Sequence, residues 1–413
     1  MKKIMLILLI TTSPVFSQET DSISLFDCFE WAVNNYPLYS QKNLNDQVSQ
    51  YRISNISKSW LPSVNANGQA TYQSDVIETS FFTAPHDQYK LYLNINQNIY
   101  DGGISRQQKE MEYTNLDLSQ QQLEVNFHNL KQQVSSVYFS LVMITKSHEQ
   151  LNLMLNDLKE KHKAIEVAVN NGAALPSSEQ SLRAEILTLQ QQSDELVNKK
   201  NSLIDVLKQL TGKDINNETL LSVPEMTEMN DSLQPRPEMR LFDYQQQLID
   251  NNIGLSQSLK RPKFYAYSEA GYGKPGLNFL NDKFETYYIV GLGLKWNLFD
   301  WGELKNNKRS AEAQKNIIEL KKDDFNRNID IALQNELAYI KNFQDAIDKD
   351  KEITALRSEI AAGAFSRFKN GTATATDYIT EVNAELKAKL QMEIHKISLV
   401  QSLINYQLIK GDI

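Results

Sequence analysis

The chain has 413 residues and a formal net charge of −8, with 51 acidic against 43 basic residues. Nucleic acid is not an expected partner for such an acidic chain. The mean hydropathy is low at −0.47, and beyond the first residues no stretch approaches the about 20 apolar residues that a transmembrane helix needs. The five histidines do not cluster at metal-ligand spacing, and no set of catalytic side chains is evident, so we expect no metal, no cofactor and no enzymatic activity.

Residues 1–17 have the features of a secretory signal peptide. Two lysines precede a short apolar run, and a small residue, Ser17, stands at the expected cleavage site. The run is too short to span a bilayer as a helix, and a buried N-terminal helix is the alternative. We therefore expect an exported protein whose mature chain begins at Gln18.

Several short motifs recur at a spacing of 199 residues. The recurring motifs are Asp101-Gly102-Gly103 with Asp300-Trp301-Gly302, and Asn171-Gly172 with Asn370-Gly371. Self-similarity at a fixed spacing predicts two copies of one supersecondary unit. We assign residues 18–212 to the first copy and 236–413 to the second, with residues 213–235 linking them.

Each copy is predicted to run in the order helix, two strands, very long helix, shorter helix. Pro62 and Pro262 end the first helical segments, and the Asn-Gly pairs end the long helices. The predicted helices cover residues 24–60, 104–170, about 177–211, 236–260, 303–369 and about 376–410. Each long helix would measure about 100 Å, which no globular domain of this size needs.

The predicted strands alternate apolar and polar residues. Leu91, Leu93 and Ile95 alternate with Asn94 and Asn96, and the other runs follow the same period of two. The polar set is rich in Asn, Gln and Gly, as in a water-filled lumen, and aromatic residues lie towards the strand ends, where interfacial girdles sit. An antiparallel sheet on a soluble core would alternate in the same way.

The number of strands predicts an assembly. Four strands cannot close a barrel, and open sheet edges in lipid would leave backbone groups unsatisfied. Because closure takes at least about eight strands, identical chains must each contribute four. Two chains would give eight strands and three would give twelve, and the residues themselves do not choose between these numbers.

The first long helix carries a coiled-coil seam. Apolar residues repeat every seven positions from Leu116 to Ile165, and a second row runs from Phe127 to Val169. The matching row of the second long helix is looser, and its small residues suggest closer approach by neighbours. With shorter helices stacked end to end beside them, the long helices would form the staves of a cylinder.

The order of elements, their doubling and three passages resemble the TolC family of outer-membrane efflux channels. The passages are LYLNINQNIYDGG at 91–103, GLGLKWNLFDWGE at 291–303 and FKNGTATATDYITEVNAEL at 368–386. The resemblance implies a mixed α+β membrane protein, a homotrimer whose 12-stranded outer-membrane β-barrel is continued by a long α-helical barrel in the periplasm. It also implies a periplasmic adaptor protein and an inner-membrane pump as partners in a tripartite efflux or secretion system.

The family further implies a constriction at the periplasmic tips. Asp377 matches an acidic ring residue, Thr380 stands where a second acid often occurs, and Phe368 stands where an aromatic link residue is common. Three carboxylates around a narrow pore would favour cations. Asp377 and Thr374 also have the spacing of a helix capping box, which is a purely structural explanation for the same aspartate.

The turns after the long helices are the expected docking tips. Gly172 and Gly371 are predicted to end these helices in the left-handed conformation that permits a sharp reversal. The family implies that the adaptor contacts these turns through the glycines and their neighbours, which are Ala173, Leu175, Thr372 and Ala375.

A structural or adhesive coiled-coil protein of the cell envelope is the competing interpretation. Such a protein would not need two pairs of alternating strands in corresponding places. We therefore expect an exit duct in the cell outer membrane, in contact with its lipid and extending into the periplasm. The residues do not identify the exported solute or the class of pump.

Overall fold

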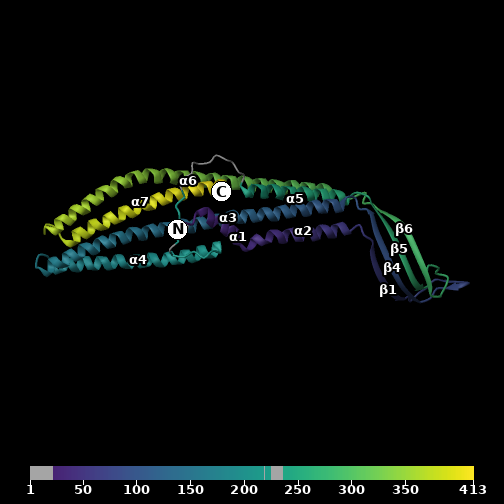
Figure 1. Ribbon diagram of the computed structural model, residues 1–413. Helices are drawn as coiled ribbons and strands as arrows, with labels where there is room; N and C mark the ends of the chain where they lie inside the picture. Colours follow the sequence, from purple (N-terminus) through teal and green to yellow (C-terminus); the bar gives the residue numbers. More distant parts are fainter. Residues whose placement is uncertain (1–21, 218, 225–235) are drawn as a thin grey trace, which may run out of the picture. The chain divides into compact units, whose positions relative to one another are not determined.

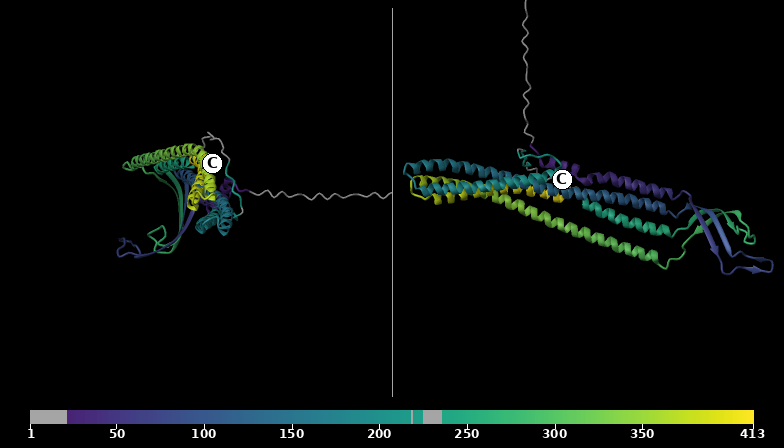
Figure 2. Two further views of the ribbon diagram at one scale, coloured as in Figure 1. Left: turned by 90° about the vertical axis from the view of Figure 1, so that its left-hand side faces the viewer. Right: turned by 90° about the horizontal axis from the view of Figure 1, so that it is seen from below.

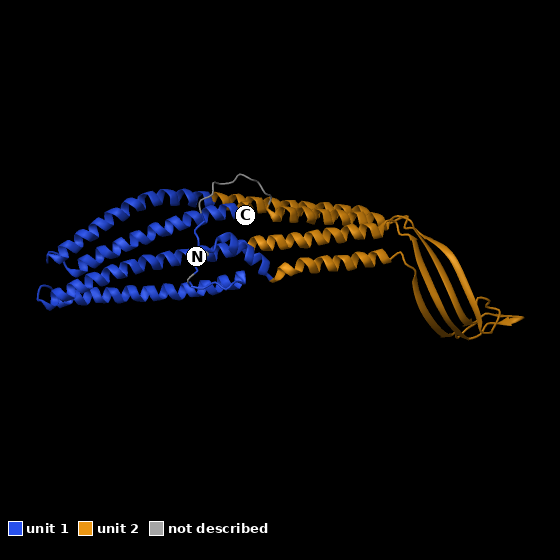
Figure 3. Cartoon of the chain, in the orientation of Figure 1, with its two compact units in different colours: residues 1–36, 130–231, 335–408 blue, residues 37–129, 232–334, 409–413 orange. Residues whose placement is uncertain are grey.

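The computed structural model describes residues 22–217, 219–224 and 236–413. The chain divides into two compact units (Figure 3). Unit 1 comprises residues 1–36, 130–231 and 335–408, and unit 2 comprises residues 37–129, 232–334 and 409–413. The predicted signal peptide and residues 225–235 of the predicted linking segment lie outside the described residues.

Unit 1 is built from helices (Figure 1). It contains α1 (Leu25–Asn35), α4 (Pro176–Thr211), most of α7 (Ala375–Lys410) and the C-terminal parts of the long helices α3 (Ile104–Asn170) and α6 (Glu303–Lys369). Short turns join α3 to α4 and α6 to α7, and the two helices of each pair lie side by side (Figure 2). Both long helices begin and end at the predicted residues and contain 67 residues each.

The apolar rows of the long helices differ in burial. On α3 both rows are largely buried, and Val134, Leu151 and Leu158 are almost inaccessible. Leu151 and Leu158 belong to a core that α4, α6 and α7 complete, which confirms that the seven-residue repeat marks a packing seam. On α6, by contrast, Ile353 and Ile360 of the predicted row are exposed in the single chain.

The prediction of a helix over residues 24–60 is wrong in one respect, because two helices and a 3-10 turn occupy this range. Helix α1 ends at Asn35, a 3-10 turn η1 follows at Pro37–Ser40, and α2 covers Gln41–Lys58. The interruption has a local cause, since Tyr36 precedes a proline and adopts an extended conformation with ψ 128°. Periodicity alone did not reveal the break.

Unit 2 combines a sheet with helices. Its helices are α2, α5 (Pro237–Leu259) and the N-terminal parts of α3 and α6. At the start of α5, Arg236 forms a buried ion pair of 2.6 Å with Glu238 and donates a 2.8 Å hydrogen bond to the carbonyl of Ile409. Burial opposes ionisation of Glu238, but the hydrogen bonds from Arg236 prevail and its pKa is lowered.

The sheet has four antiparallel strands in the order β1-β4-β5-β6. The strands are β1 (Ser63–Tyr72), β4 (Asp87–Tyr100), β5 (Lys263–Lys274) and β6 (Glu285–Lys295). Two short strands that were not predicted, β2 (Glu78–Thr79) and β3 (Phe82–Thr83), form a hairpin in the loop between β1 and β4. Within the described residues, β1 and β6 each pair along one side only, so the sheet has two open edges.

The two faces of the sheet carry different side chains. One face presents exposed apolar residues, among them Leu91, Val290 and Leu292. On the other face, a Cβ atom at Gly291 or Gly293 would overlap the ring of Tyr267 or Tyr265. The glycines within β6 therefore make room for tyrosines of β5, and none of the described residues covers the apolar face of the sheet.

None of the helices in the described part of the chain is long and apolar enough to cross a membrane.

Candidate functional site: the two hairpin turns

The turns at the ends of α3 and α6 have the same backbone geometry. The N–H of Gly172 donates to the carbonyl of Val169 at 2.9 Å, and the N–H of Ala173 donates to that of Ala168 at 2.7 Å. In the second turn, Gly371 donates to Phe368 and Thr372 donates to Arg367, both at 3.0 Å. This pair of hydrogen bonds is the Schellman motif, which satisfies the last carbonyls of a helix.

Glycine is required at these turns because of the backbone and not because of crowding. Gly172 and Gly371 both have φ 72°, and no atom lies within 4 Å of a Cβ built on either. The predicted left-handed helix ends are confirmed. Because no described residue covers these glycines, the turns are accessible to a partner.

The other predicted tip residues are not equally accessible. Ala173, Leu175 and Thr372 are exposed, and Leu175 reaches 70% exposure. Ala375, in contrast, is buried in the core of unit 1 and offers no side-chain surface in the single chain. The accessible surface of the tips is therefore formed by fewer residues than predicted.

Asp377 and Thr374 form the predicted capping box at the start of α7. The backbone N–H of Thr374 donates to Asp377 Oδ2 at 2.9 Å, and the N–H of Asp377 donates to Thr374 Oγ1 at 3.2 Å. The hydrogen bonds from the backbone and hydroxyl of Thr374 lower the pKa of Asp377. The carboxylate remains solvent-exposed, so capping does not remove its charge from the surface.

Thr380 lies one turn after Asp377 on α7 and is also exposed. Its hydroxyl donates to the carbonyl of Thr376 at 2.9 Å, a bond within its own helix. Asp377 and Thr380 are three residues apart and therefore share one face of α7. A ring role for either residue stays a prediction.

Phe368 lies below the turn and not on its surface. It is buried, and its ring stacks on the fully buried ring of Tyr378 with centroids 5.9 Å apart. Phe365 packs against the same tyrosine at 5.3 Å. This packing accounts for an aromatic residue at position 368, and its predicted part in a pore constriction stays a prediction.

Two residues beneath the turns were not predicted as part of the site. The ammonium of Lys161 lies 5.0 Å from the ring centroid of Phe365 and 5.5 Å from that of Tyr378, and it pairs with Asp157 at 2.6 Å. Lys161 of α3 thus contacts side chains of both α6 and α7. Tyr378 could have been found from its spacing with Val382 and Leu386, which is that of a buried helix face.

The passages from strand to helix also carried the family resemblance in the sequence. Before α3, Asp101 accepts hydrogen bonds of 2.8 Å from the N–H groups of Gly103 and Ser105. Before α6, Asp300 accepts bonds of 3.1 Å from Gly302 and Leu304. Each aspartate therefore caps the helix that follows it, which explains the recurrence of this residue in the sequence.

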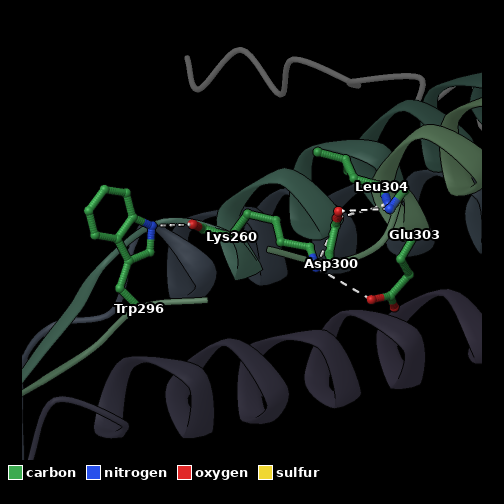
Figure 4. A network of polar contacts seen from close by, with 6 residues as sticks. Lys260, Trp296, Asp300, Glu303 and Leu304 are labelled. Carbon is green, nitrogen blue, oxygen red and sulfur yellow. Dashed lines mark hydrogen bonds and ion pairs between the residues drawn. The ribbon is translucent and has the colours of Figure 1, made fainter. Parts of the chain in front are cut away.

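The passage before α6 is further held by Lys260, the residue after α5 (Figure 4). Its ammonium lies 3.0 Å from Asp300 and 3.4 Å from Glu303, and its carbonyl accepts a 3.1 Å bond from the indole N–H of Trp296. The hydrogen bond between the two side chains raises the pKa of Lys260 and lowers that of Asp300. Both groups are therefore charged over the whole physiological range.

In the part of the chain that the structure describes, no three His, Cys, Asp or Glu residues are grouped so that they could hold a metal ion. The geometry of the tips and of the strand-to-helix passages consists of caps, turns and ion pairs. Such an arrangement can position surfaces and charges, and it contains no nucleophile activated by an adjacent base.

Residues 229–405 match the model of a family described as outer membrane efflux protein. None of the curated proteins compared with the chain matches it significantly. Among solved structures, the outer membrane protein VceC of Vibrio cholerae is 16% identical, with coverage of 92% of this chain and 95% of that chain and a TM-score of 0.69. The CmeC outer membrane channel of Campylobacter jejuni is 18% identical, with coverage of 94% and 85% and a TM-score of 0.70.

The MtrE outer membrane channel of Neisseria gonorrhoeae, solved in its open state, is 16% identical, with coverage of 94% and 88% and a TM-score of 0.68. At these identities the likeness to the three structures is one of fold. The family description names the outer membrane, which is the location predicted from the sequence. The chain thus has the fold of these outer-membrane channels, and its residues 229–405 match the family of outer membrane efflux proteins, which the resemblance in the sequence indicated.

Proposed function

We propose that the chain is one subunit of an outer-membrane channel through which exported solutes leave the cell. Three copies would join their sheets into a closed barrel of twelve strands, and their helices would continue the duct into the periplasm. The number three comes from the resemblance to the TolC family. We also propose that the chain consists of two copies of one structural unit, residues 18–212 and 236–413.

The observation that carries the proposal is the sheet with two open edges and an uncovered apolar face. The open edges lie on β1 and β6, the first and last strands of the sheet. Leu292, on β6, is 79% exposed in the single chain. Unpaired strand edges are a liability in water and are not tolerated in lipid, but closure into a barrel pairs both edges and turns the apolar face to the membrane.

The helices support the same assembly. Helix α6 exposes apolar residues along much of its length, and these include Ile317, Leu320, Ile331, Leu337, Ile353 and Leu356. The repeated exposure of large apolar side chains along one long helix favours an interaction surface. In a trimer this surface would pack against the helices of a neighbouring copy.

The tips would dock on a periplasmic adaptor protein that links the channel to an inner-membrane pump. The exposed residues Gly172, Ala173, Leu175, Gly371 and Thr372 are available for this contact. Asp377 and Thr380 would face the pore at its narrow end. The channel would act as a passive duct, with energy supplied by the pump.

Assembly state and membrane location test the proposal together. The protein should be found in the outer-membrane fraction, and mild detergent should extract it as a species with three times the mass of the mature chain, measured by light scattering. On a gel this species should dissociate to monomer when heated. Reconstitution of the trimer in a planar bilayer should give stable conducting pores.

A species of twice the mature mass would contradict the trimer but keep the closed barrel of eight strands. A monomer in the soluble periplasmic fraction would reject the channel and would favour a structural coiled-coil protein of the envelope.

A further inference from the structure

The loop that joins β6 to α6 exposes an unusual number of large apolar side chains. Trp296, Leu298, Phe299 and Trp301 are all exposed, and Trp301 is 90% exposed. The rings of Phe299 and Trp301 pack edge to face, with centroids 4.7 Å apart. We call residues 296–301 the junction loop.

Trp301 also adopts a strained backbone conformation. Its φ is 51°, and it is the only described residue other than glycine with a positive φ. In the corresponding passage before α3 the same place is held by Gly102, with φ 76°. A bulky residue in the left-handed region costs free energy. Because Trp301 buries almost no surface in the chain, packing does not repay this cost.

A basic hollow lies beside the junction loop at the start of α6. It has a volume of about 560 Å³, and its lining includes Lys305, Lys308 and Arg309 together with Asp300 and Glu312. Among the described residues, none of the three basic side chains forms an ion pair, whereas Asp300 is already paired with Lys260 (Figure 4). Because Asp300 is paired with Lys260, the three basic side chains face only Glu312 among the acidic residues of the lining, and the hollow carries a net positive charge.

The passage before α3 provides a comparison within the same chain. There, a Cβ at Gly103, the equivalent of Gly302, would lie 3.3 Å from the guanidinium of Arg261 and 3.8 Å from the hydroxyl of Ser258, so residues at the end of α5 cover this passage. At Gly302, before α6, no atom of the described residues lies within 4 Å of such a Cβ. The passage before α6, which carries the exposed Trp301 and the basic side chains, is thus the less covered of the two.

We propose that the junction loop and the first turns of α6 form a binding site for an anionic phospholipid. Phe299 and Trp301 enter the boundary between headgroups and acyl chains, and Lys305, Lys308 and Arg309 bind the phosphate. This inference rests on the proposed function, which places the end of β6 at the periplasmic surface of the outer membrane. A lipid is favoured over a protein because tryptophan next to cations is the composition of a membrane interface.

The test measures lipids bound to the full-length protein in mild detergent by native mass spectrometry. The probes are phosphatidylglycerol, which is anionic, and phosphatidylcholine, which has no net charge. One variant carries Lys305→Gln, Lys308→Gln and Arg309→Gln. Its matched control carries Lys321→Gln, Lys341→Gln and Lys349→Gln, which remove the same charge from exposed positions elsewhere on α6.

The wild-type protein should retain phosphatidylglycerol in preference to phosphatidylcholine. Neutralisation of the hollow should weaken phosphatidylglycerol binding roughly tenfold or more, because each basic residue near a membrane surface contributes to anionic lipid binding. The control variant should bind as the wild type does. Equal retention by the hollow variant and the wild type would overturn the proposal.

Trp301→Gly provides an independent readout. This change relieves the strained conformation and copies Gly102, so the variant should unfold at the same temperature or a higher one. It should nevertheless lose phosphatidylglycerol affinity. A variant that keeps its lipid but no longer assembles would overturn the proposal and identify the junction loop as a contact between copies of this chain.

The same spectra distinguish a failure of the proposed function from a failure of this inference. The mass of the wild-type species reports whether the chain forms a trimer. Phosphatidylglycerol retention is read separately on whichever species is present, and its loss in the hollow variant alone supports the lipid site.

Discussion

Asp377 has two explanations, and single-residue changes can separate them. As a cap it accepts hydrogen bonds from Thr374, and as a pore residue it would supply a negative charge. Asparagine keeps an acceptor oxygen for the cap but has no charge. Alanine at position 374 removes the hydroxyl that caps α7 but leaves the charge of Asp377.

We predict that Asp377→Asn weakens the cation preference of the reconstituted channel, measured as a reversal potential in planar bilayers. Thr374→Ala should leave selectivity unchanged and destabilise the start of α7 by about 1 kcal/mol. The pKa of Asp377 is lowered, so its charge and its capping contribution persist until the pH falls below the usual aspartate range of about 3.9. Cation preference should therefore be lost only at such a low pH.

An Asp377→Asn channel with unchanged selectivity would leave capping as the sole role of this residue. The capping box itself could be predicted from sequence because it depends on spacing alone, with a threonine three residues before an aspartate. The burial of Phe368 could not be predicted in the same way. It depends on Tyr378, which reaches it from another helix.

At the scale of the elements, the long helices were the most predictable part of the fold. A seven-residue repeat over many turns and a glycine at the end define α3 and its bounds from local information. The break at Pro37 and the small hairpin of β2 and β3 were missed. A short apolar period does not distinguish one helix from two, and two-residue strands have no period at all.

The exposed apolar residues of α6 are predicted to form the contact between copies. Ile353→Asp should prevent assembly, because the charge would be buried without a partner in the trimer but exposed to water in the single chain. Lys351→Asp, at an exposed position on the opposite side of the helix, is the control and should assemble. Assembly is measured by light scattering and helix content by circular dichroism.

Leu158→Ala is a second control, which tests whether lower stability of the single chain alone prevents assembly. Leu158 is fully buried within the chain, so its truncation should cost about 2–5 kcal/mol of stability without adding charge at a contact between copies. A trimer that forms normally with Ile353→Asp would contradict the assignment of this surface of α6.

At the scale of the whole molecule, the sheet and α6 lead to the same requirement. A sheet with two open edges and a helix with exposed apolar residues are both incomplete in a single chain. The need for several copies could be inferred from the number of strands in the sequence, because four cannot close. The proposed number of three could not be inferred in this way, since the number of copies depends on strand tilt and on side-chain packing between copies, which local patterns do not encode.

The tips are where the proposed channel would meet its partner, and the last prediction concerns them. Ala173→Glu and Thr372→Glu place a bulky charge on exposed positions of the two turns. Neither change should disturb the protomer, because the Schellman hydrogen bonds are made by backbone atoms and Thr372→Glu removes only one exposed side-chain bond, from the Thr372 hydroxyl to the carbonyl of Arg367. Both should weaken co-purification of the channel with the adaptor protein of the same cell by at least about tenfold, since a charge without a partner at a docking surface is costly.

Gln192→Glu adds a similar charge at an exposed position of α4 away from the turns, and this control should keep both the trimer and the adaptor. Export by cells that carry each variant should follow adaptor binding, because a duct that is not joined to its pump conducts no substrate from it. If the tip variants retain the adaptor and full export, docking takes place elsewhere on the helices. If they lose the trimer instead, the turns contribute to assembly and not to the partner.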